Sequence, residues 1–248
     1  DGSLLGSFDS ILRLMPVGAV VVGDETTDQT ISTDIEDPSS VLIKHGSNTV
    51  TYTGTRISSG VTSIDQGTLK VAGGNQLGSG EVKLDGGELE LSQSTTVTNN
   101  ISSSNDSSAI DTGTNTVAVS GTLSGSGAIT KTGSGTLKLT GALNNTGGFA
   151  VSEGELNVNN ASGSAPATLS GGTLSGAGTI GTLTANSGTI APGNSIGTLN
   201  VSGNVTLGSS NILVIEVDSD GNSDKIVATG SVAAGGTLKI SPETSETY

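Results

Sequence analysis

The chain has 248 residues and a formal net charge of −14 at pH 7, from 9 basic and 23 acidic residues. Hydrophobic residues make up 32% and aromatic residues 2%, whereas glycine occupies 39 positions. This excludes a globular core of bulky side chains and favours a thin aliphatic core repeated between tight turns. The charge content of 13% and the mean hydropathy of +0.01 argue against disorder. Basic residues are too few and too scattered for nucleic-acid binding, and the lack of cysteine excludes disulfides, thiol catalysis and cysteine-type zinc sites.

Residues 1–30 are expected to form an end coil or cap. Their most apolar stretch, Leu4–Val22, is interrupted by charged residues and Pro16 and has no basic segment before it, so it fits neither a membrane span nor a signal peptide. Four apolar residues fall at helical spacing in this stretch: Phe8, Ile11, Leu12 and Met15. With Ser7 as the cap and Pro16 as the stop, this spacing predicts a short helix. An irregular end coil is the alternative interpretation.

From residue 31 onward, short units recur in which glycine is followed by alternating polar and apolar residues. Such alternation predicts short β-strands with one buried side, and the leading glycine permits the positive φ of a sharp corner. The clearest units are Gly67–Val71, Gly87–Leu91, Gly135–Leu139, Gly154–Val158, Gly197–Val201 and Gly236–Ile240. Strands of this length cannot bury their apolar side alone, so we expect them to stack on one another.

A longer repeat contains several of these units. Residues Leu42–Val71 align with Ile129–Val158 without a gap, at an offset of 87 residues. Lys44 aligns with Lys131, and the glycines and aliphatic positions follow the same order in both copies. Tandem self-similarity of this kind is typical of a solenoid.

The sequence therefore predicts an all-β chain folded as a right-handed parallel β-helix, or β-solenoid. The corner strands recur about every 14–20 residues, a reasonable length for one coil, which gives about ten to twelve coils. We expect β-helix repeats over residues 31–202 and further coils over residues 203–248. Leu, Val and Ile should point inward in ladders, with Ser, Thr and Asn facing water or the turns.

Residues Gly121–Val158 resemble the passenger-associated transport repeat, also called the autotransporter-associated β-strand repeat. They read GTLSGSGAITKTGSGTLKLTGALNNTGGFAVSEGELNV, against a family pattern of roughly GxLxKxGxGTLxLxGxNxYTGxTxVxxGxLxV. The chain departs from the pattern at its Asn-x-Tyr, where Leu143–Asn145 stands, and the copy at residues 42–71 has Asn48 in place of the second glycine. The resemblance covers about residues 30–240 and implies the passenger domain of an autotransporter, a type V secretion protein.

The C-terminal third is similar to the end of many such passengers. Three stretches carry this likeness: residues 171–180 (GGTLSGAGTI), 191–199 (APGNSIGTL) and 221–227 (GNSDKIV). In the family this region lies near the autochaperone part that folds first after export, so the resemblance implies the same for residues 203–248. The dense apolar run Ile212–Ile215 is a candidate part of the nucleus. The family also has a C-terminal outer-membrane β-barrel, and no barrel-length run of alternating strands occurs before Tyr248.

The candidates for catalysis are weak. A Ser-His-Asp triad or a histidine metal site would have to use His45, the only histidine. In the 87-residue repeat His45 aligns with Thr132, so a polar position on a repeat strand explains it. The nucleophile-elbow pattern fails at Gly121–Gly125, where Leu123 occupies the serine position. We predict no catalytic residue and no enzyme activity.

One acidic turn, Asp218–Asp224, offers oxygen ligands for calcium. It departs from the EF-hand loop, since Gly221 is misplaced and Thr229 stands where the loop requires glutamate. A hydrophilic turn is the favoured interpretation. Polysaccharide-cleaving β-helices need clustered carboxylates and usually aromatic platforms, whereas the acids here are scattered and the aromatic residues are Phe8, Tyr52, Phe149 and Tyr248. No metal ligand and no cofactor-binding residue is predicted.

The repetitive, polar-sided solenoid, together with the resemblance, favours a non-catalytic protein of the bacterial surface, exported through the periplasm and the outer membrane. Adhesion to a host surface, or association with another copy of the chain, is the leading hypothesis for its function. Each side-chain hydrogen bond contributes only about 1 kcal/mol, and a repeat supplies such bonds in rows. The alternative is a structural stalk and folding scaffold, with a toxin or enzyme activity upstream of residue 1.

Overall fold

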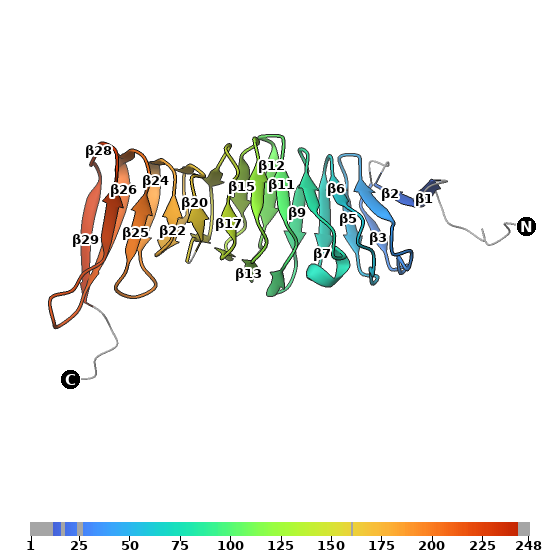
Figure 1. The fold of residues 1–248 in the computed structure, drawn as a ribbon, viewed down its shortest axis with the longest axis horizontal. Coiled ribbons are helices and arrows are strands. Elements are labelled where there is room, and N and C mark those ends of the chain that lie inside the picture. The colour runs from blue at the N-terminus through green and yellow to red at the C-terminus, as the bar shows by residue number, and fades with distance from the viewer. Residues whose placement is uncertain (1–11, 16–17, 24–26, 160, 243–248) are drawn as a thin grey trace, which may run out of the picture.

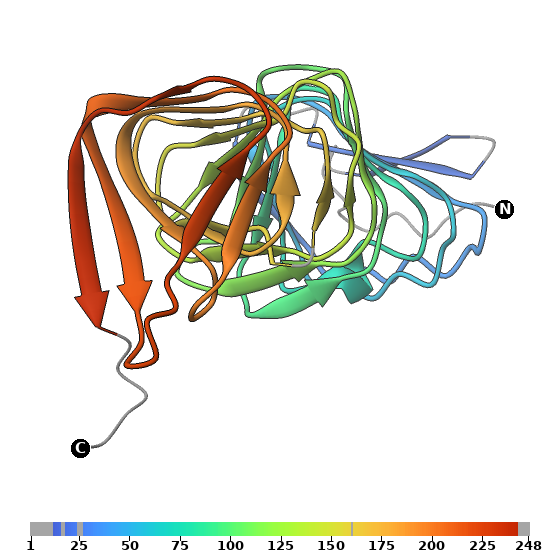
Figure 2. The same ribbon diagram turned by 60° about the vertical axis from the view of Figure 1, so that its left-hand side comes forward.

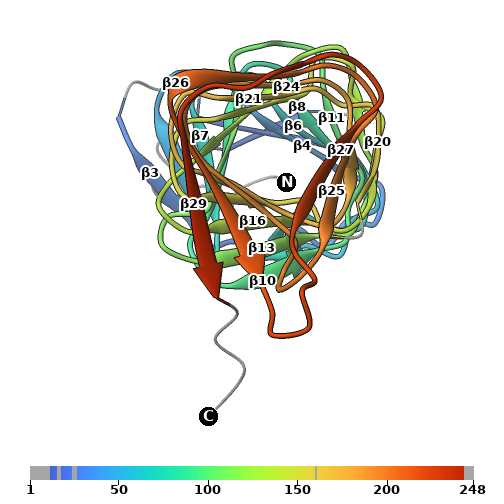
Figure 3. The ribbon, with the colours of Figure 1, turned by 90° about the vertical axis from the view of Figure 1, so that its left-hand side faces the viewer.

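The chain forms one rod of stacked strands in a computed structural model that describes residues 12–15, 18–23, 27–159 and 161–242 (Figure 1). The coils wrap around a common interior, as Figures 2 and 3 show from two further directions. This parallel β-solenoid of about ten turns confirms the all-β fold predicted from the sequence. In the described part, the helical structure is one 3-10 turn, η1 (Gly74–Gln76), and no helix there is long and apolar enough to cross a membrane.

The coils have three sides, which we call the first, second and third side. The first side is a 12-stranded sheet. Its strands are β1 (Leu12–Met15), β2 (Ala19–Val22), β4 (Val41–Lys44), β6 (Thr62–Ile64), β8 (Val82–Leu84), β11 (Ile101–Ser103), β14 (Leu123–Gly125), β17 (Ala142–Leu143), β20 (Ser162–Gly163), β23 (Thr179–Ile180), β25 (Thr198–Val201) and β27 (Lys225–Ala228).

The second and third sides belong to a 17-stranded sheet that turns a corner. The second side contains β3 (Gln29–Ile31), β5 (Thr49–Tyr52), β7 (Thr68–Val71), β9 (Glu88–Leu91), β12 (Ser108–Asp111), β15 (Ile129–Thr132), β18 (Phe149–Val151), β21 (Ala167–Leu169) and β28 (Val232–Ala233). The third side contains β10 (Thr95–Val97), β13 (Thr116–Val119), β16 (Thr136–Leu139), β19 (Glu155–Asn157), β22 (Thr173–Gly176) and β29 (Thr237–Pro242). Two long strands, β24 (Leu183–Pro192) and β26 (Val205–Val217), run over both sides.

Stacked strands pair in parallel from one coil to the next. On the first side, Leu42 of β4 pairs with Thr62 of β6, and Ile101 of β11 pairs with Leu123 of β14. One coil therefore takes about 20 residues, at the upper end of the predicted spacing. Within the stack, this arrangement gives a short strand one neighbouring strand before it and one after it, which is how strands of three or four residues become stable.

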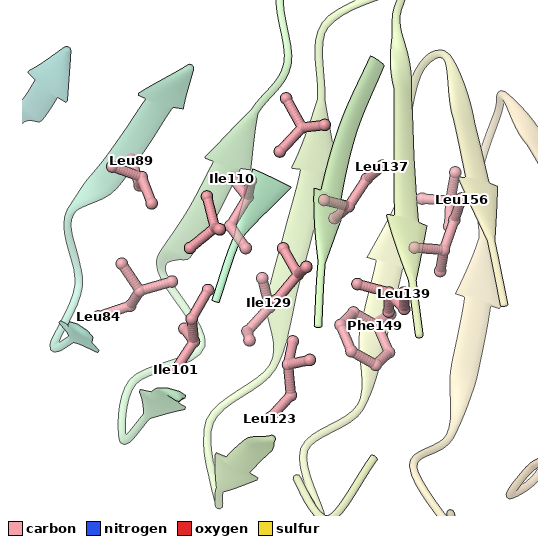
Figure 4. Packing of buried hydrophobic residues seen from close by; sticks show 14 of the residues in the cluster. Leu84, Leu89, Ile101, Ile110, Leu123, Ile129, Leu137, Leu139, Phe149 and Leu156 are labelled. Carbon is pink, nitrogen blue, oxygen red and sulfur yellow. The ribbon is translucent and has the colours of Figure 1, made fainter. Parts of the chain in front are cut away.

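The inward positions form continuous aliphatic ladders. On the second side, Val50, Leu69, Leu89 and Ile110 follow one another through consecutive strands, and all four are fully buried. Figure 4 shows side chains such as Leu89, Ile110 and Leu137 gathered in the same interior. Each strand alternates buried with partly exposed residues, as in β7 and β16, because successive side chains of a strand point to opposite faces. The alternation in the sequence therefore specifies which residues enter the core.

Glycine at the corners is required by close packing. Gly67 and its repeat partner Gly154 both have φ of +61°, a conformation that side-chain-bearing residues rarely adopt. A β-carbon on Gly67 would lie 2.8 Å from the Nζ atom of Lys44, and one on Gly154 would lie 2.8 Å from Nζ of Lys131. The corner of the 87-residue repeat is thus the same in both copies.

The two copies of this repeat nevertheless occupy different sides of the rod. β4 and β5 lie on the first and second sides, whereas the aligned strands β15 and β16 lie on the second and third sides. The strand–corner–strand conformation and the buried positions are retained. The reason is length, because 87 residues make about four and one-third coils rather than a whole number.

The prediction of a short helix near the N-terminus is wrong where the structure describes it. Leu12–Met15 is strand β1, which pairs antiparallel with β2. Backbone pairing with β2 gives this segment hydrogen bonds that an isolated turn of helix would lack. Phe8, Ile11, Ser7 and Pro16 lie outside the described residues. The domain limits at residues 30 and 202 stay predictions.

Candidate functional site

His45 lies at the corner that follows β4, on the surface. Its Nδ1 atom is 3.9 Å from Oδ2 of Asp65, and the two side chains are 57% and 37% exposed. Thr132, its repeat partner, ends the aligned strand β15. Nowhere in the described part do three or more His, Cys, Asp or Glu side chains gather as metal ligands would. A polar corner position remains our interpretation of His45.

The elbow-like letters at Gly121–Gly125 belong to the stack of the first side. Leu123 is fully buried in β14. A β-carbon on Gly121 would lie 1.9 Å from the carbonyl oxygen of Asn99 in the preceding coil, so glycine is needed here for close approach between coils. Close packing accounts for the glycine, and the strained strand-to-helix turn of a nucleophile elbow is not formed at this place.

The acidic turn at Asp218–Asp224 uses its carboxylates to hold itself together. Asp218 accepts hydrogen bonds from the backbone N–H groups of Asp220 and Asn222 and from the amide of Asn222. The hydrogen bonds from Asn222 lower the pKa of the Asp218 carboxyl. Asp224 is buried and accepts from the backbone N–H groups of Gly197 and Glu216, each at 2.8 Å. It ties two coils together, a role that the sequence analysis missed.

Two lysines are fully buried at equivalent corners, and sequence reasoning did not predict their burial. The Nζ atom of Lys44 donates to the backbone carbonyls of His45, Gly46 and Gln66 at 3.1, 2.6 and 3.0 Å. Burial lowers the pKa of the Lys44 ammonium from 10.5 to about 8, and the charge of Asp28 opposes this.

Lys131 repeats this arrangement 87 residues later. Its Nζ atom donates to the carbonyls of Thr132, Gly133 and Glu153 at 2.7, 2.7 and 3.5 Å. Burial again lowers the pKa to about 8. One signal for this exists in the sequence, since both lysines occupy an inward position of the strand alternation. Both act as donors to corner carbonyls, which is a structural role.

Arg56 is the third buried cation. Its guanidinium donates to the backbone carbonyls of Ser40, Gly60, Val61 and Leu77. It also donates to side-chain hydroxyls of the same coils, and burial lowers its pKa. Because the planar guanidinium has several donors in fixed positions, one arginine hydrogen-bonds to backbone carbonyls of consecutive coils in the early part of the rod.

Many outer hydroxyls also connect coils. A serine or threonine directly after a strand repeatedly donates to a carbonyl one coil earlier, at 3.0–3.5 Å. The pairs are Thr53 with Ile31, Ser92 with Val71, Thr140 with Val119, Ser152 with Lys131, Ser170 with Val151 and Ser202 with Ile180. Part of the serine and threonine content of the chain therefore serves the fold rather than a ligand.

Two hollows are worth describing. A cavity of about 380 Å³ at the early end of the rod is lined by core residues such as Val20, Ile31 and Val50, so it continues the apolar interior. A shallow cleft of about 220 Å³ on the third side is lined by Glu155, Ser175 and other residues. There the Nδ2 atom of Asn157 donates to Ser175 at 2.8 Å, and Ser175 donates to Glu155. These polar groups are paired with one another.

The remaining candidate is the outer surface itself. On the second side, one outward position of each strand follows the next through six strands in register: Thr130, Ala150, Thr168, Thr184, Thr206 and Ala233. All six side chains are exposed or partly exposed. This regular row of short side chains is a flat surface suited to contact with another macromolecule rather than to chemistry on a small substrate.

Comparison with known proteins gives one relative. The chain is 38% identical over 136 residues to a protein of Brucella suis biovar 1 (strain 1330) that is named "Adhesin BmaC autotransporter". The match covers 52% of this chain but only 4% of the relative. No family model matches the chain, and no solved structure matches it.

Proposed function

We propose that this chain, whose similarity and β-solenoid fold fit an autotransporter passenger domain, forms part of a bacterial surface adhesin. The relative is named an adhesin and an autotransporter, and we extend both terms to this protein. In this proposal the chain is exported through the periplasm and the outer membrane and acts at the cell surface or as a secreted protein. It binds a host surface or another copy of itself, and it does not bind nucleic acid.

The observation that carries this proposal is the regular outer surface. Rows of exposed short polar side chains, such as Thr168 and Thr206 on the second side, repeat at the spacing of the coils, about 4.8 Å. A single hydroxyl contact contributes little, about 1 kcal/mol, so binding through such a surface requires many contacts at once. A solenoid provides them without any specialised pocket.

We also propose that the chain is not an enzyme. Its buried cations donate to backbone carbonyls, and the carboxylates of Asp218 and Asp224 accept from backbone N–H groups. The lone histidine pairs with an exposed carboxylate in water. In each case the group already has a structural partner, which supports a non-catalytic role without a metal or cofactor.

The second candidate function is a stalk and folding scaffold. It is favoured by the small fraction of the relative, 4%, that this chain spans. A solenoid of near-neighbour contacts can add coil after coil, so it can display another part of a long protein at a distance from the membrane. Under this alternative, any binding or toxic activity of the whole protein lies outside residues 1–248.

Deleting residues 27–242 in frame from the whole protein on its own cells tests the proposal. The surface level of the remaining protein is measured with an epitope tag, and an internal control replaces the segment with an unrelated β-solenoid of similar length. Cell clumping and adherence to host cells are then scored. We expect one or both to fall in the deletion and in the replacement.

The two candidates predict different results for the replacement. If the unrelated solenoid restores full clumping and adherence, the segment is only a spacer and the stalk function is correct. If clumping and adherence are unchanged even in the simple deletion at equal surface level, the adhesive function of this segment is refuted.

A further inference from the structure

Charge is distributed very unevenly along the chain. Residues 156–215 contain no Asp, Glu, Lys, Arg or His, although the whole chain carries a net charge of −14. This segment builds consecutive coils from β20 to most of β26. The acidic rod therefore contains a stretch of uncharged coils.

On the second side the uncharged region is longer than this segment. Strands β15, β18, β21, β24, β26 and β28 stack there without an outward charge, because Lys131 of β15 points inward and is fully buried. We call the outward surface of these six strands the neutral patch. Its middle row contains Thr130, Ala150, Thr168, Thr184, Thr206 and Ala233.

Charged residues delimit the neutral patch toward the early coils and toward the third side. Earlier strands of the same side carry Lys70, Glu88, Glu90 and Asp111 at outward positions. The third side carries Lys138, Glu155, Glu216 and Lys239. On the first side, the strands from β11 to β25 carry no charge either, and charge returns there at Lys83 of β8 and Lys225 of β27. The uncharged surface therefore continues onto the first side, and the neutral patch is the part of it that lies on the second side.

We propose that the neutral patch docks against the neutral patch of a second copy of this chain. Two chains of net charge −14 repel one another, and like charges brought into contact oppose binding strongly. The neutral patch lets two rods meet without repulsion between facing charges. Uncharged threonine and alanine side chains also let two sheets approach closely, and the Thr hydroxyls can donate and accept across the contact. This inference rests on the self-association part of the proposed function.

The size of the patch sets the strength of this contact. Six strands at about 4.8 Å spacing span about 25 Å along the rod, and strands of two to four residues at about 3.3 Å per residue make the patch about 10 Å wide. A contact over this patch covers about 250 Å² per copy, well below the roughly 800 Å² per partner of a stable complex. The isolated chains should therefore associate weakly, whereas cells that display many copies should clump strongly through avidity.

The lack of cysteine in the chain allows a clean test by disulfide cross-linking. In the whole chain, Thr184→Cys places one thiol in the neutral patch. Thr51→Cys is the matched control, since Thr51 is an outward threonine of the same side beside Lys70. At high protein concentration under mild oxidation, we expect at least tenfold more disulfide-linked dimer for Thr184→Cys. Equal yields from the two variants would overturn the proposal.

A second measurement introduces charge into the contact. The double variant Thr168→Asp/Thr206→Asp is compared with Thr49→Asp/Thr51→Asp, after circular dichroism has shown that both are folded. Sedimentation should show self-association weakened at least tenfold by the first pair and little changed by the second. Association that is equally sensitive to both pairs, or to neither, contradicts the patch.

Cells displaying these variants distinguish a failure of the docking surface from a failure of the proposed function. If deletion of the segment abolishes clumping but Thr168→Asp/Thr206→Asp does not, the proposed function stands and the neutral patch is the wrong surface. If the patch variants lose clumping and keep adherence to host cells, the patch is specific for a second copy. If they lose host adherence alone, the partner is a host surface and the inference fails.

Discussion

The coils before residue 156 and the uncharged coils at residues 156–215 pair their buried backbone groups with different side chains. In the coils before residue 156, the buried cations Lys44, Arg56 and Lys131 donate to backbone carbonyls, and so do the buried amides of Asn48 and Asn99. In the uncharged coils, which contain no lysine or arginine, buried Asn211 donates to the carbonyl of Gly188 and accepts from the N–H of Gly208. The aliphatic alternation is the same in both regions. The comparison teaches that the inward strand positions and the corner glycines fix this fold, while the polar side chains that pair with the corner backbone and the outward positions are free to vary.

The largest expected effect is on the early coils, from Arg56→Met. This substitution removes the hydrogen bonds from the buried guanidinium to four backbone carbonyls, so we expect local stability to fall by about 3 kcal/mol. Hydrogen exchange measured by mass spectrometry should show faster exchange in the coils around β4 and β6 and unchanged exchange in the uncharged coils. Because a solenoid is stabilised by nearest neighbours, the change should stay local.

Arg56→Lys provides the control for this prediction. It keeps the positive charge but has a single nitrogen in place of the planar fork, so it should recover only part of the loss. If Arg56→Met exchanges no faster than the natural chain, the four carbonyl contacts do not contribute to stability.

The buried lysines predict a pH effect confined to the charged coils. Their pKa is about 8 in the folded chain and 10.5 when exposed. Between these pH values the unfolded chain holds protons that the folded chain has released, so stability rises with pH. From pH 7 to 9.5 the gain should be on the order of 1–2 kcal/mol for each lysine.

This gain is measured as the difference between the natural chain and Lys44→Met/Lys131→Met. The difference removes the contribution of Tyr52, whose pKa is raised by burial and acts in the opposite direction near pH 10. Hydrogen exchange would again report each region, after correction for the intrinsic effect of pH. A difference that does not change with pH would mean that both ammonium groups remain protonated in the fold.

In the uncharged coils the expected effects are smaller. Ser170→Ala and Ser202→Ala each remove a hydroxyl donated to the preceding coil, and each should reduce local stability by about 0.5–1 kcal/mol. The double variant should be additive within error, because the two bonds lie in different coils. Urea unfolding measures the loss of stability, and hydrogen exchange in β18 and β23 shows where the loss occurs. Ser124→Ala, on the outer first side, is the control.

The smallest effect should come from the surface pair Lys70–Glu90. Their Nζ and Oε1 atoms lie 2.5 Å apart on partly exposed side chains, and such pairs contribute about 0.2–1 kcal/mol. Lys70→Met should therefore change stability by less than 1 kcal/mol, and the change should shrink as salt is added. A larger loss that is insensitive to salt would show that the early coils depend on surface charge more than this comparison allows.

The fold was largely predictable from the sequence, because short-range alternation and glycine corners determine it. Leu69 and Leu137 are inward in their strands as expected. The side on which each strand lies was not predictable, since it depends on the summed length of every preceding coil. The burial of Lys44 was missed because one of its carbonyl partners, Gln66, comes from the next coil. The helix expected near Leu12–Met15 failed because pairing with a neighbouring strand outweighs weak periodicity.

The candidate sites were harder to predict from the sequence for a related reason. Asp224 looked like a calcium ligand because its neighbours in sequence are acidic, whereas its contacts are the N–H groups of Gly197 and Glu216. Local composition does not report contacts made between coils. The neutral patch, in contrast, leaves a trace in the sequence as the uncharged run at residues 156–215, although only the strand register shows where the patch extends beyond it.

The mismatch between the 87-residue repeat and a whole number of coils gives duplication an unusual effect on this surface. A copied segment keeps its interior but advances by one side, so that Thr51 on the second side corresponds to Lys138 on the third. Duplication of this segment therefore moves an outward side chain from one side of the rod to the next without changing the core. Such a chain can diversify what it presents to its surroundings while its interior stays constant.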